Sequence, residues 1–239
     1  MRYYATLPEA MSEIRRDLAK GPRVISTRVQ QHTEGQFPGR EILGYTYSID
    51  PKGFPQTAEG LVALGQKLQF STFNEHADEM ISWLKIELAC RVDNSLGTLT
   101  EIMHPALKST IEGNWPAYTY AERLHGAMDA LQMALKTPDT RRAYWPIFRP
   151  EDALRAFAPT RIPCSLGYQA IIRNTSSGPE LNFFYLQRSA DFDTFFLSDI
   201  WLANRFKEIL AERLEIAPGQ FIHNIISLHS FQVEGTEIY

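Results

Sequence analysis

Gln187-Arg188-Ser189-Ala190-Asp191 is a polar run set directly behind an apolar one. The preceding residues, Leu181–Leu186, are typical of a buried strand, and Trp201–Leu214 further on is typical of a helix. An arginine, a serine and acids at the end of a buried strand are costly unless a ligand compensates them. The arginine and serine of the run are donors that suit a phosphate, and its aspartate, together with Asp199, could meet the polar edge of a ring. We therefore expect a phosphorylated small molecule that carries a hydrogen-bonding ring.

Length and composition indicate one globular domain that spans residues 1–239. Hydrophobic residues make up 44% of the chain and charged residues 22%, and the net charge of -4 gives no sign of a nucleic-acid or membrane surface. No apolar run approaches the ~18 residues that a membrane span needs, and Met1–Pro8 lacks a signal-peptide pattern. The two cysteines, Cys90 and Cys164, lack metal-type spacing, so we expect reduced thiols in a cytoplasmic protein with no metal site.

Helical and strand-like segments are both spread along the chain, which predicts an α+β domain. Apolar spacing and turn signals predict helices at Pro8–Lys20, Glu59–Leu68, Asn74–Leu88, Ala121–Lys136, Pro150–Phe157 and Trp201–Leu214. The strands are expected at Glu41–Ile49, Ala143–Phe148, Ile162–Arg173, Leu181–Leu186 and Phe221–Phe231, with a hairpin turn at Asn174–Pro179.

Two groups of residues have both a structural and a chemical interpretation. Cys164 follows a proline at the start of an apolar strand, where it is either a buried structural thiol or a nucleophile activated by nearby cations. Arg141 and Arg142 follow a helix stop, either as a solvated turn or as a pair of which one arginine reaches a ligand. Position alone favours the structural interpretation in both cases.

Two histidines and one glutamate also have both a structural and a chemical interpretation. His223 and His229 share a face of the last strand, either as satisfied core histidines or as site residues, and their spacing does not match a helical zinc site. Glu79 is either a solvated acid or a buried acid with a raised pKa on its apolar helix.

Five ordered motifs resemble the thymidylate synthase superfamily. They are Pro138-Asp139-Thr140-Arg141-Arg142, Pro163-Cys164, Gln187-Arg188-Ser189-Ala190-Asp191, Pro218-Gly219-Gln220-Phe221-Ile222-His223 and His229-Ser230-Phe231. The match is specific from about Pro138 to Phe231 and looser before it. The resemblance implies a mixed β-sheet flanked by helices, a homodimer formed through the face of the sheet, and methylenetetrahydrofolate as the one-carbon donor.

The resemblance also implies residue roles. Cys164 would add to C6 of a pyrimidine, which makes C5 able to attack the one-carbon unit. Arg188 and Ser189 would hold the 5′-phosphate, and Arg141 and Arg142 would reach the phosphate of the neighbouring subunit. The remaining members of the expected site are Glu79 as the proton-shuttling glutamate with Glu87 as the weaker candidate, Asp191 among the catalytic residues, and Gln187, Ala190, His229, Arg28 and Tyr120 among the substrate-binding ones.

Asp199 distinguishes between substrates. Thymidylate synthases have an asparagine at the matching place, eight residues beyond the signature aspartate, whereas deoxycytidylate hydroxymethylases have an aspartate. An amide can accept from N3–H of uracil and donate to O4, but a carboxylate accepts from the amino group of cytosine. Against uracil the carboxylate would face O4, acceptor against acceptor, which can cost several orders of magnitude in rate. We therefore expect a cytosine nucleotide.

Further departures from the synthases favour hydroxymethylation. Ser165 follows the nucleophile where synthases usually have histidine, no counterpart of a Trp-x-x-Trp segment is evident, and the chain ends at Tyr239, short of the region that closes over folate. A less sealed pocket would let water add to the exocyclic methylene. Phe231 and Ala190 alter the expected sugar contacts and leave room for a 2′-hydroxyl, which favours CMP, as in nucleoside-antibiotic pathways, over dCMP, as in phage DNA modification. The alternatives are a dUMP methylase and a nucleotide-binding homologue that has lost catalysis.

Overall fold

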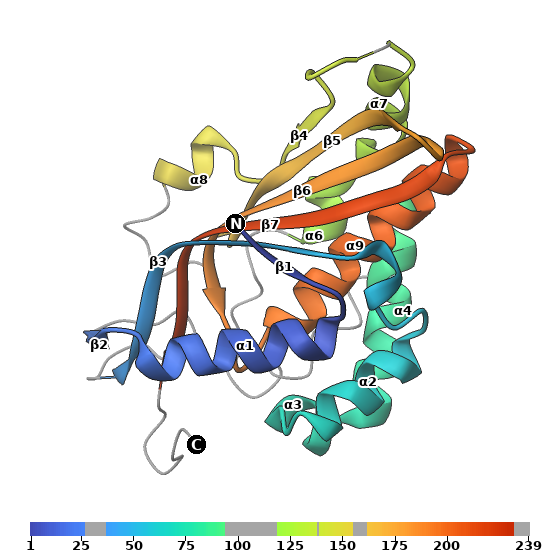
Figure 1. Ribbon diagram of the computed structural model, residues 1–239. Coiled ribbons are helices and arrows are strands. Elements are labelled where there is room, and N and C mark those ends of the chain that lie inside the picture. The colour runs from blue at the N-terminus through green and yellow to red at the C-terminus, as the bar shows by residue number, and fades with distance from the viewer. Residues whose placement is uncertain (27–36, 94–118, 138, 155–161, 232–239) are drawn as a thin grey trace.

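One twisted sheet organises the protein, with most of the helices behind and below it in the view of Figure 1. This computed structural model describes residues 1–26, 37–93, 119–137, 139–154 and 162–231. Within them the strands form a seven-stranded sheet in the order β1-β3-β7-β6-β5-β4, with β2 also paired to β3. The strands are β1 (Arg2–Tyr4), β2 (Arg23–Ser26), β3 (Phe37–Ile49), β4 (Tyr144–Pro146), β5 (Ser165–Thr175), β6 (Gly178–Asp191) and β7 (Ala217–Phe231).

The sheet is mixed, because β1 runs parallel to β3 and β6 runs parallel to β7, while the remaining pairs are antiparallel. The helices are α1 (Leu7–Lys20), α2 (Ala58–Lys67), α3 (Ser71–Glu75), α4 (Ala77–Asp93), α6 (Tyr120–Leu124), α7 (Ala127–Leu135), α8 (Pro150–Leu154) and α9 (Phe196–Arg213), with the short 3-10 turn η1 at Pro51–Gly53. The expected α+β class with a mixed sheet flanked by helices is confirmed.

Strand β6 and helix α9 form the centre of the core. On β6 the side chains of Leu181, Phe183 and Tyr185 alternate into the interior, as the period of two in a strand requires. They pack against α9, which is buried along most of its length, and Trp201 of α9 donates from Nε1 to the carbonyl of Pro55 at 2.7 Å. Helix α9 begins at Phe196, five residues before the expected start, so Asp199 lies in its first turn. The earlier start brings this acid over the end of the sheet.

Two predicted helices are wrong as single elements. The predicted helix Asn74–Leu88 is divided at His76, whose backbone (φ -132°, ψ 38°) ends α3 before α4 begins. The predicted helix Ala121–Lys136 is divided at Gly126, which takes the left-handed conformation with φ 77°. Apolar periodicity continues across both breaks, whereas the helical backbone conformation does not. At the second break, a residue such as glycine is needed to adopt the positive φ without strain.

Among the helices of the described residues, none has both the length and the hydropathy that crossing a bilayer would demand.

Candidate active site

Arg188 fastens the segment that carries Cys164 to strand β6. Its backbone N–H donates to the carbonyl of Cys164 at 2.8 Å. Its side chain donates from Nε to the carbonyl of Pro163 at 2.9 Å and from Nη2 to that of Ile162 at 3.3 Å. Three bonds from one residue hold the approach to β5, so the half-buried thiol of Cys164 stands at a fixed place beside the end of β6.

Ser165, the residue after the thiol, joins two tyrosines from different elements. Its Oγ lies 2.6 Å from the hydroxyl of Tyr185 on β6 and 3.1 Å from that of Tyr120 on α6. The register of β5 against β6 shifts between Ser165 and Gly167, which marks a bulge directly after the thiol. Burial raises the pKa of Tyr185 well above its ordinary value, so this phenol keeps its proton. The cluster therefore ties Ser165, the residue next to Cys164, to β6 and α6.

A buried chain of hydrogen bonds runs from Asp199 across the sheet. Gln187 donates from Nε2 to Oδ2 of Asp199 at 3.1 Å, and its Oε1 lies 3.0 Å from Nε2 of His223. Nδ1 of His223 lies 2.9 Å from the hydroxyl of Tyr47. Burial lowers the pKa of His223 to about 3, so the ring is neutral and carries one proton.

The neutral ring of His223 takes the tautomer that gives every hydrogen bond of this network a donor and an acceptor. With the proton on Nε2, the ring donates to Gln187 and accepts from Tyr47, and the Gln187 amide nitrogen then points at the carboxylate of Asp199. The opposite tautomer would turn the Gln187 oxygen towards that carboxylate, acceptor against acceptor. The network thus presents Asp199 as a hydrogen-bond acceptor held from behind.

A second polar cluster lies on α4 and faces the same region. Nε of Arg91 donates to Oε1 of Glu87 at 2.7 Å, and Nη1 lies 3.4 Å from the hydroxyl of Tyr168 on β5. The side chains of Arg91 and Glu87 are only 3% and 6% exposed. The charge of Asp199 acts on both Arg91 and Tyr168, which places these groups in one electrostatic neighbourhood. Burial raises the pKa of Tyr168 to about 12 despite the opposing charge of Arg91.

Glu79 lies elsewhere on the same helix. Its side chain is 49% exposed, and one carboxylate oxygen lies 3.7 Å from Nδ1 of His76. Glu79 precedes Glu87 by eight residues, roughly 12 Å along a helix axis. The structure therefore groups Glu87, and not Glu79, with Arg91 and Tyr168.

The residues expected around the phosphate and sugar are spread along β6, β7 and the turn before β4. Ser189 and Asp191 are half-buried near the end of β6, and Asp191 pairs in register with His229 of β7. The ring of His229 lies 4.7 Å from that of Phe231, and its Nδ1 is 3.3 Å from the hydroxyl of Ser227. Ala190 is 1% exposed and belongs to the apolar core. These residues lie on neighbouring strands and so share one end of the sheet.

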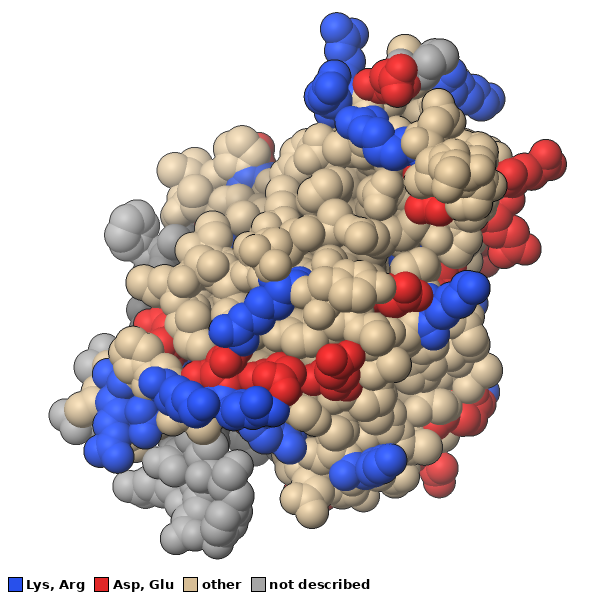
Figure 2. Space-filling view, viewed as in Figure 1, with Lys and Arg blue, Asp and Glu red and all other residues tan. Residues whose placement is uncertain are grey.

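The paired arginines lie apart from this set. Arg141 and Arg142 are exposed in the turn before β4. Figure 2 shows basic side chains gathered at the end of the molecule where α7 and β4 meet. The predicted phosphate ligand Arg28 lies outside the described residues, as does Pro138 of the arginine motif.

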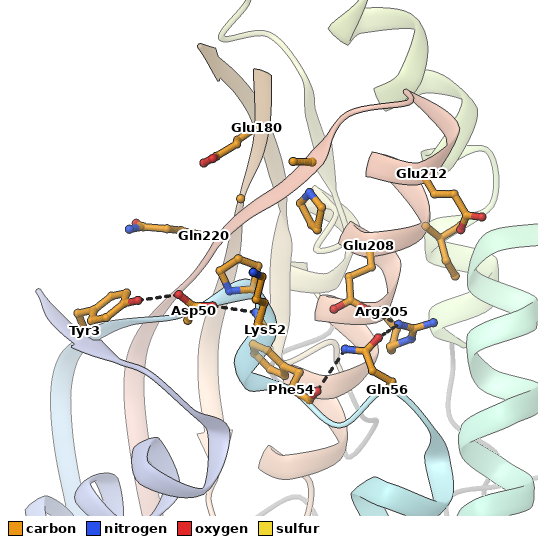
Figure 3. A pocket seen from close by; sticks show the side chains of 15 residues that line it. Tyr3, Asp50, Lys52, Phe54, Gln56, Glu180, Arg205, Glu208, Glu212 and Gln220 are labelled. Atoms are coloured by element: carbon orange, nitrogen blue, oxygen red, sulfur yellow. Dashed lines mark hydrogen bonds and ion pairs between the residues drawn. The ribbon is translucent and has the colours of Figure 1, made fainter. Parts of the chain in front are cut away.

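A separate cavity of about 860 Å³ opens at the far end of α9, between η1 and the start of β7 (Figure 3). Its side chains are already engaged with one another: Tyr3 donates to Asp50 at 2.8 Å, and Arg205 donates to Gln56 at 2.9 Å. No residue predicted for the site lines it.

Sequence reasoning missed the partners that position the predicted residues. No sequence motif pointed to Arg91, Tyr168 or Tyr185, or to the hydrogen bonds of His223. The spacing of Glu87 and Arg91, four residues apart on one side of a helix, was the available signal for the ion pair. The histidine network depends on strand pairing between distant segments, which the spacing of residues does not give.

Fold and site together define an α+β protein that carries a thiol beside a buried polar cluster. The thymidylate synthase family model matches residues 92–237, more than half of the chain. The chain therefore belongs to the thymidylate synthase family.

Solved structures agree on the fold. The chain is similar to a thermostable thymidylate synthase A from Bacillus subtilis, with a TM-score of 0.60 and 14% identity over 95% of this chain and 80% of that one. It is also similar to the thymidylate synthase of T4 phage, with a TM-score of 0.59 and 16% identity over 95% and 77%. No curated protein matches the sequence. At these identities the structural likeness supports the fold alone.

We expect the His223 network to make the free energy of unfolding decrease at acid pH. The pKa of His223 is about 3 in the folded protein, against an ordinary value of 6.5. The unfolded chain therefore binds more protons than the folded protein between these two pH values. The free energy of unfolding should therefore be fully present above pH 6.5 and fall by up to about 1.4 kcal/mol per pH unit as the pH drops towards 3. Urea denaturation of the wild type and of His223→Asn at several pH values measures the difference. The wild type should lose more stability than the variant over this window, and parallel curves for the two proteins would show that His223 does not titrate in this way.

Proposed function

We propose that this protein is a pyrimidine nucleotide C5-hydroxymethyltransferase that converts CMP, or dCMP, into its 5-hydroxymethyl derivative. The observation that carries the proposal is the hydrogen bond from Nε2 of Gln187 to Oδ2 of Asp199, 3.1 Å long, because it orients Asp199 as an acceptor. The 4-amino group of cytosine is a donor and complements this carboxylate, whereas O4 of uracil is a second acceptor. Membership of the thymidylate synthase family supports one-carbon transfer at C5.

Cys164 begins the reaction by adding its thiolate to C6 of the pyrimidine. The new bond makes C5 nucleophilic, and N3 of the cytosine becomes basic enough to take a proton. Arg188 keeps the segment around Cys164 in place through the carbonyls of Ile162 and Pro163, which holds the sulfur at the base. Asp199 accepts from the amino group and stabilises the proton at N3.

Methylenetetrahydrofolate supplies the one-carbon unit at the oxidation level of formaldehyde. The half-buried Cys164 and the polar wall of Tyr120, Ser165 and Tyr185 suit a ring held beside this donor. C5 would bond to the methylene carbon of the donor and lose its own proton, and the bond from that carbon to the folate nitrogen would break, which leaves an exocyclic methylene on C5 and releases tetrahydrofolate. Water then adds to the exocyclic methylene, and expulsion of the Cys164 thiolate restores the aromatic ring. Tetrahydrofolate leaves without oxidation. Reduced Cys164 is required throughout, which fits a cytoplasmic setting.

Phosphate and sugar binding complete the proposal. Arg188 and Ser189, with Asp191 and His229 beside them, would hold the nucleotide at the end of β6 and β7. The side chain of Ala190 is only a methyl group. We favour CMP over dCMP because a larger or polar side chain at this position would fill the space that a 2′-hydroxyl needs.

The open face of the sheet fits a homodimer. Phe184 and Leu186 of β6 are only half-buried, and Ile226 of the adjacent β7 is 57% exposed. The surface over these strands is largely uncharged in Figure 2. A second copy packed on this face would bury these apolar side chains and bring Arg141 and Arg142 towards the partner's nucleotide.

The substrate assignment is tested by exchanging Asp199 for asparagine. The wild type should turn over CMP or dCMP with methylenetetrahydrofolate and incorporate solvent oxygen, and its kcat/KM for the cytosine nucleotide should exceed that for the matching uracil nucleotide. Asp199→Asn should reverse this preference by about 10²-fold or more, because the amide can donate to O4. Asp199→Glu, which keeps the charge but displaces it, is the matched control and should lose activity without gaining a uracil preference.

Steady-state kinetics with CMP, dCMP, UMP and dUMP and mass analysis in labelled water supply the readouts. A wild type that methylates dUMP, without oxygen from water, would identify a thymidylate synthase instead.

We propose further that Glu87, and not Glu79, is the glutamate that handles protons at the base. Glu87 is buried beside Arg91 and Tyr168, whereas Glu79 is half exposed. Glu87→Gln should lower kcat/KM by about 10²-fold or more, the usual size of a general acid–base contribution, while Glu79→Gln on the same helix should stay within about twofold. Tritium release from C5-labelled CMP measures both variants. A large loss in Glu79→Gln with a near-normal Glu87→Gln would restore the role to Glu79.

A further inference from the structure

His229, near the end of β7, is held on two sides by side chains from its own face of the sheet. Ser227 and Phe231 lie two residues before and after it, so all three side chains share that face. The centroids of the Phe231 and His229 rings are 4.7 Å apart, and the hydroxyl of Ser227 lies 3.3 Å from Nδ1 of His229. These two contacts set the orientation of the histidine ring, with Nδ1 towards Ser227.

Glu41 of the neighbouring strand β3 determines the direction of the bond between Ser227 and His229. Glu41 is in register with His229, and its Oε1 accepts the hydroxyl proton of Ser227 at 2.5 Å. A serine hydroxyl has only one proton to give. Because that proton goes to Glu41, the oxygen of Ser227 can only accept from His229. Nδ1 of His229 therefore carries a hydrogen.

The second ring nitrogen of His229 is left bare. Burial lowers the pKa of His229 and outweighs the opposing effect of its acidic neighbours Glu41 and Asp193, so the ring is neutral and holds one proton. With that proton on Nδ1, Nε2 presents a lone pair. Within the part of the chain that the structure describes, no group forms a hydrogen bond with this nitrogen. His223 on the same strand has the opposite tautomer, with its proton on Nε2.

We propose that Glu41 is a positioning residue: through Ser227 it holds His229 in the tautomer whose bare Nε2 accepts a hydrogen bond from a hydroxyl of the bound sugar. This inference rests on the proposed function and deepens it, because it states which part of the nucleotide His229 meets. A ribose hydroxyl has a hydrogen to give, whereas an oxygen of an ionised phosphate would place one lone pair against another. His229 thus binds the sugar and leaves the phosphate to the donors of Arg188 and Ser189.

The tautomer of His229 is measured without any ligand, by NMR of the ring nitrogens at neutral pH. In the wild type, Nδ1 of His229 should give the signal of a protonated ring nitrogen and Nε2 that of a bare one. His223 should show the reverse and is the reference within the same spectrum. The variant His229→Gln identifies the signals of His229, because they disappear from its spectrum.

Variants of Ser227 and Glu41 separate positioning from general support of the fold. Ser227→Ala removes the acceptor of the Nδ1 hydrogen, and Glu41→Gln lets an amide donate to Ser227, whose proton can then turn to Nδ1. Both should populate the tautomer with hydrogen on Nε2, while Ser227→Thr, which keeps the hydroxyl, should retain the wild-type signals. Thr46→Val is the matched control, because Thr46 donates from β3 to Asn224 of β7 at 3.0 Å. It should leave the tautomer of His229 unchanged.

Calorimetry with altered sugars tests the acceptor role of His229. The wild type should bind CMP about tenfold or more tightly than the analogue that lacks both ribose hydroxyls, because the analogue leaves Nε2 without a donor. In Glu41→Gln this ratio of affinities should fall by about threefold or more, and in Thr46→Val it should match that of the wild type. The analogues that lack only the 2′- or only the 3′-hydroxyl show which of the two His229 meets.

The inference fails if His229 of the wild type carries its hydrogen on Nε2, or if Ser227→Ala and Glu41→Gln leave either the tautomer or the sugar ratio unchanged. If Glu41→Gln does not fold, the contrast between Ser227→Ala and Ser227→Thr decides both measurements. A wild type that binds UMP or dUMP but not CMP would refute the proposed function, and the same sugar series on the uracil nucleotide would then judge Glu41 separately. A wild type that binds no nucleotide would refute the sugar role together with the proposed function.

Discussion

A neutral, fully buried histidine sets the direction of the hydrogen bonds on which the site depends. His223 has no solvent to stabilise a second proton, and burial lowers its pKa to about 3. Of the two tautomers of the singly protonated ring between Tyr47 and Gln187, only the one with the proton on Nε2 lets Gln187 turn its amide nitrogen, rather than its oxygen, to the carboxylate of Asp199. Gln187 must then give its amide hydrogens to Asp199. The core of the protein thus holds the carboxylate of Asp199 in place from the side of Gln187.

The fold joins this network to the segment of Cys164 through a single strand. Gln187 and Arg188 are neighbours on β6, and their side chains take opposite tasks: one orients Asp199, and the other binds the carbonyls before Cys164. Because successive residues of a strand point to opposite faces, one rigid element positions the recognition group and the thiol independently. On α4, Glu87 and Arg91 form a buried ion pair.

Sequence reasoning gave the α+β class, the family and the strand–helix order around β6, because these depend on local periodicity and on motifs that are contiguous in the chain. It predicted continuous helices across His76 and Gly126 and so missed both breaks, since these depend on backbone conformation rather than on apolar spacing. The choice of Glu79 over Glu87 as the proton-shuttling glutamate stays a prediction: both lie on α4, and the sequence could not show that Glu87 is buried whereas Glu79 is half exposed. The link between His223 and Gln187 requires the parallel pairing of β6 with β7, which brings together residues far apart in sequence.

The most direct measurement is a crystal structure of the protein with CMP bound. The account predicts that a carboxylate oxygen of Asp199 lies within about 3.2 Å of the 4-amino nitrogen, with Gln187 still donating to Asp199 and the sulfur of Cys164 beneath C6. A base turned away from Asp199, or Gln187 rotated so that its oxygen faces the carboxylate, would contradict it.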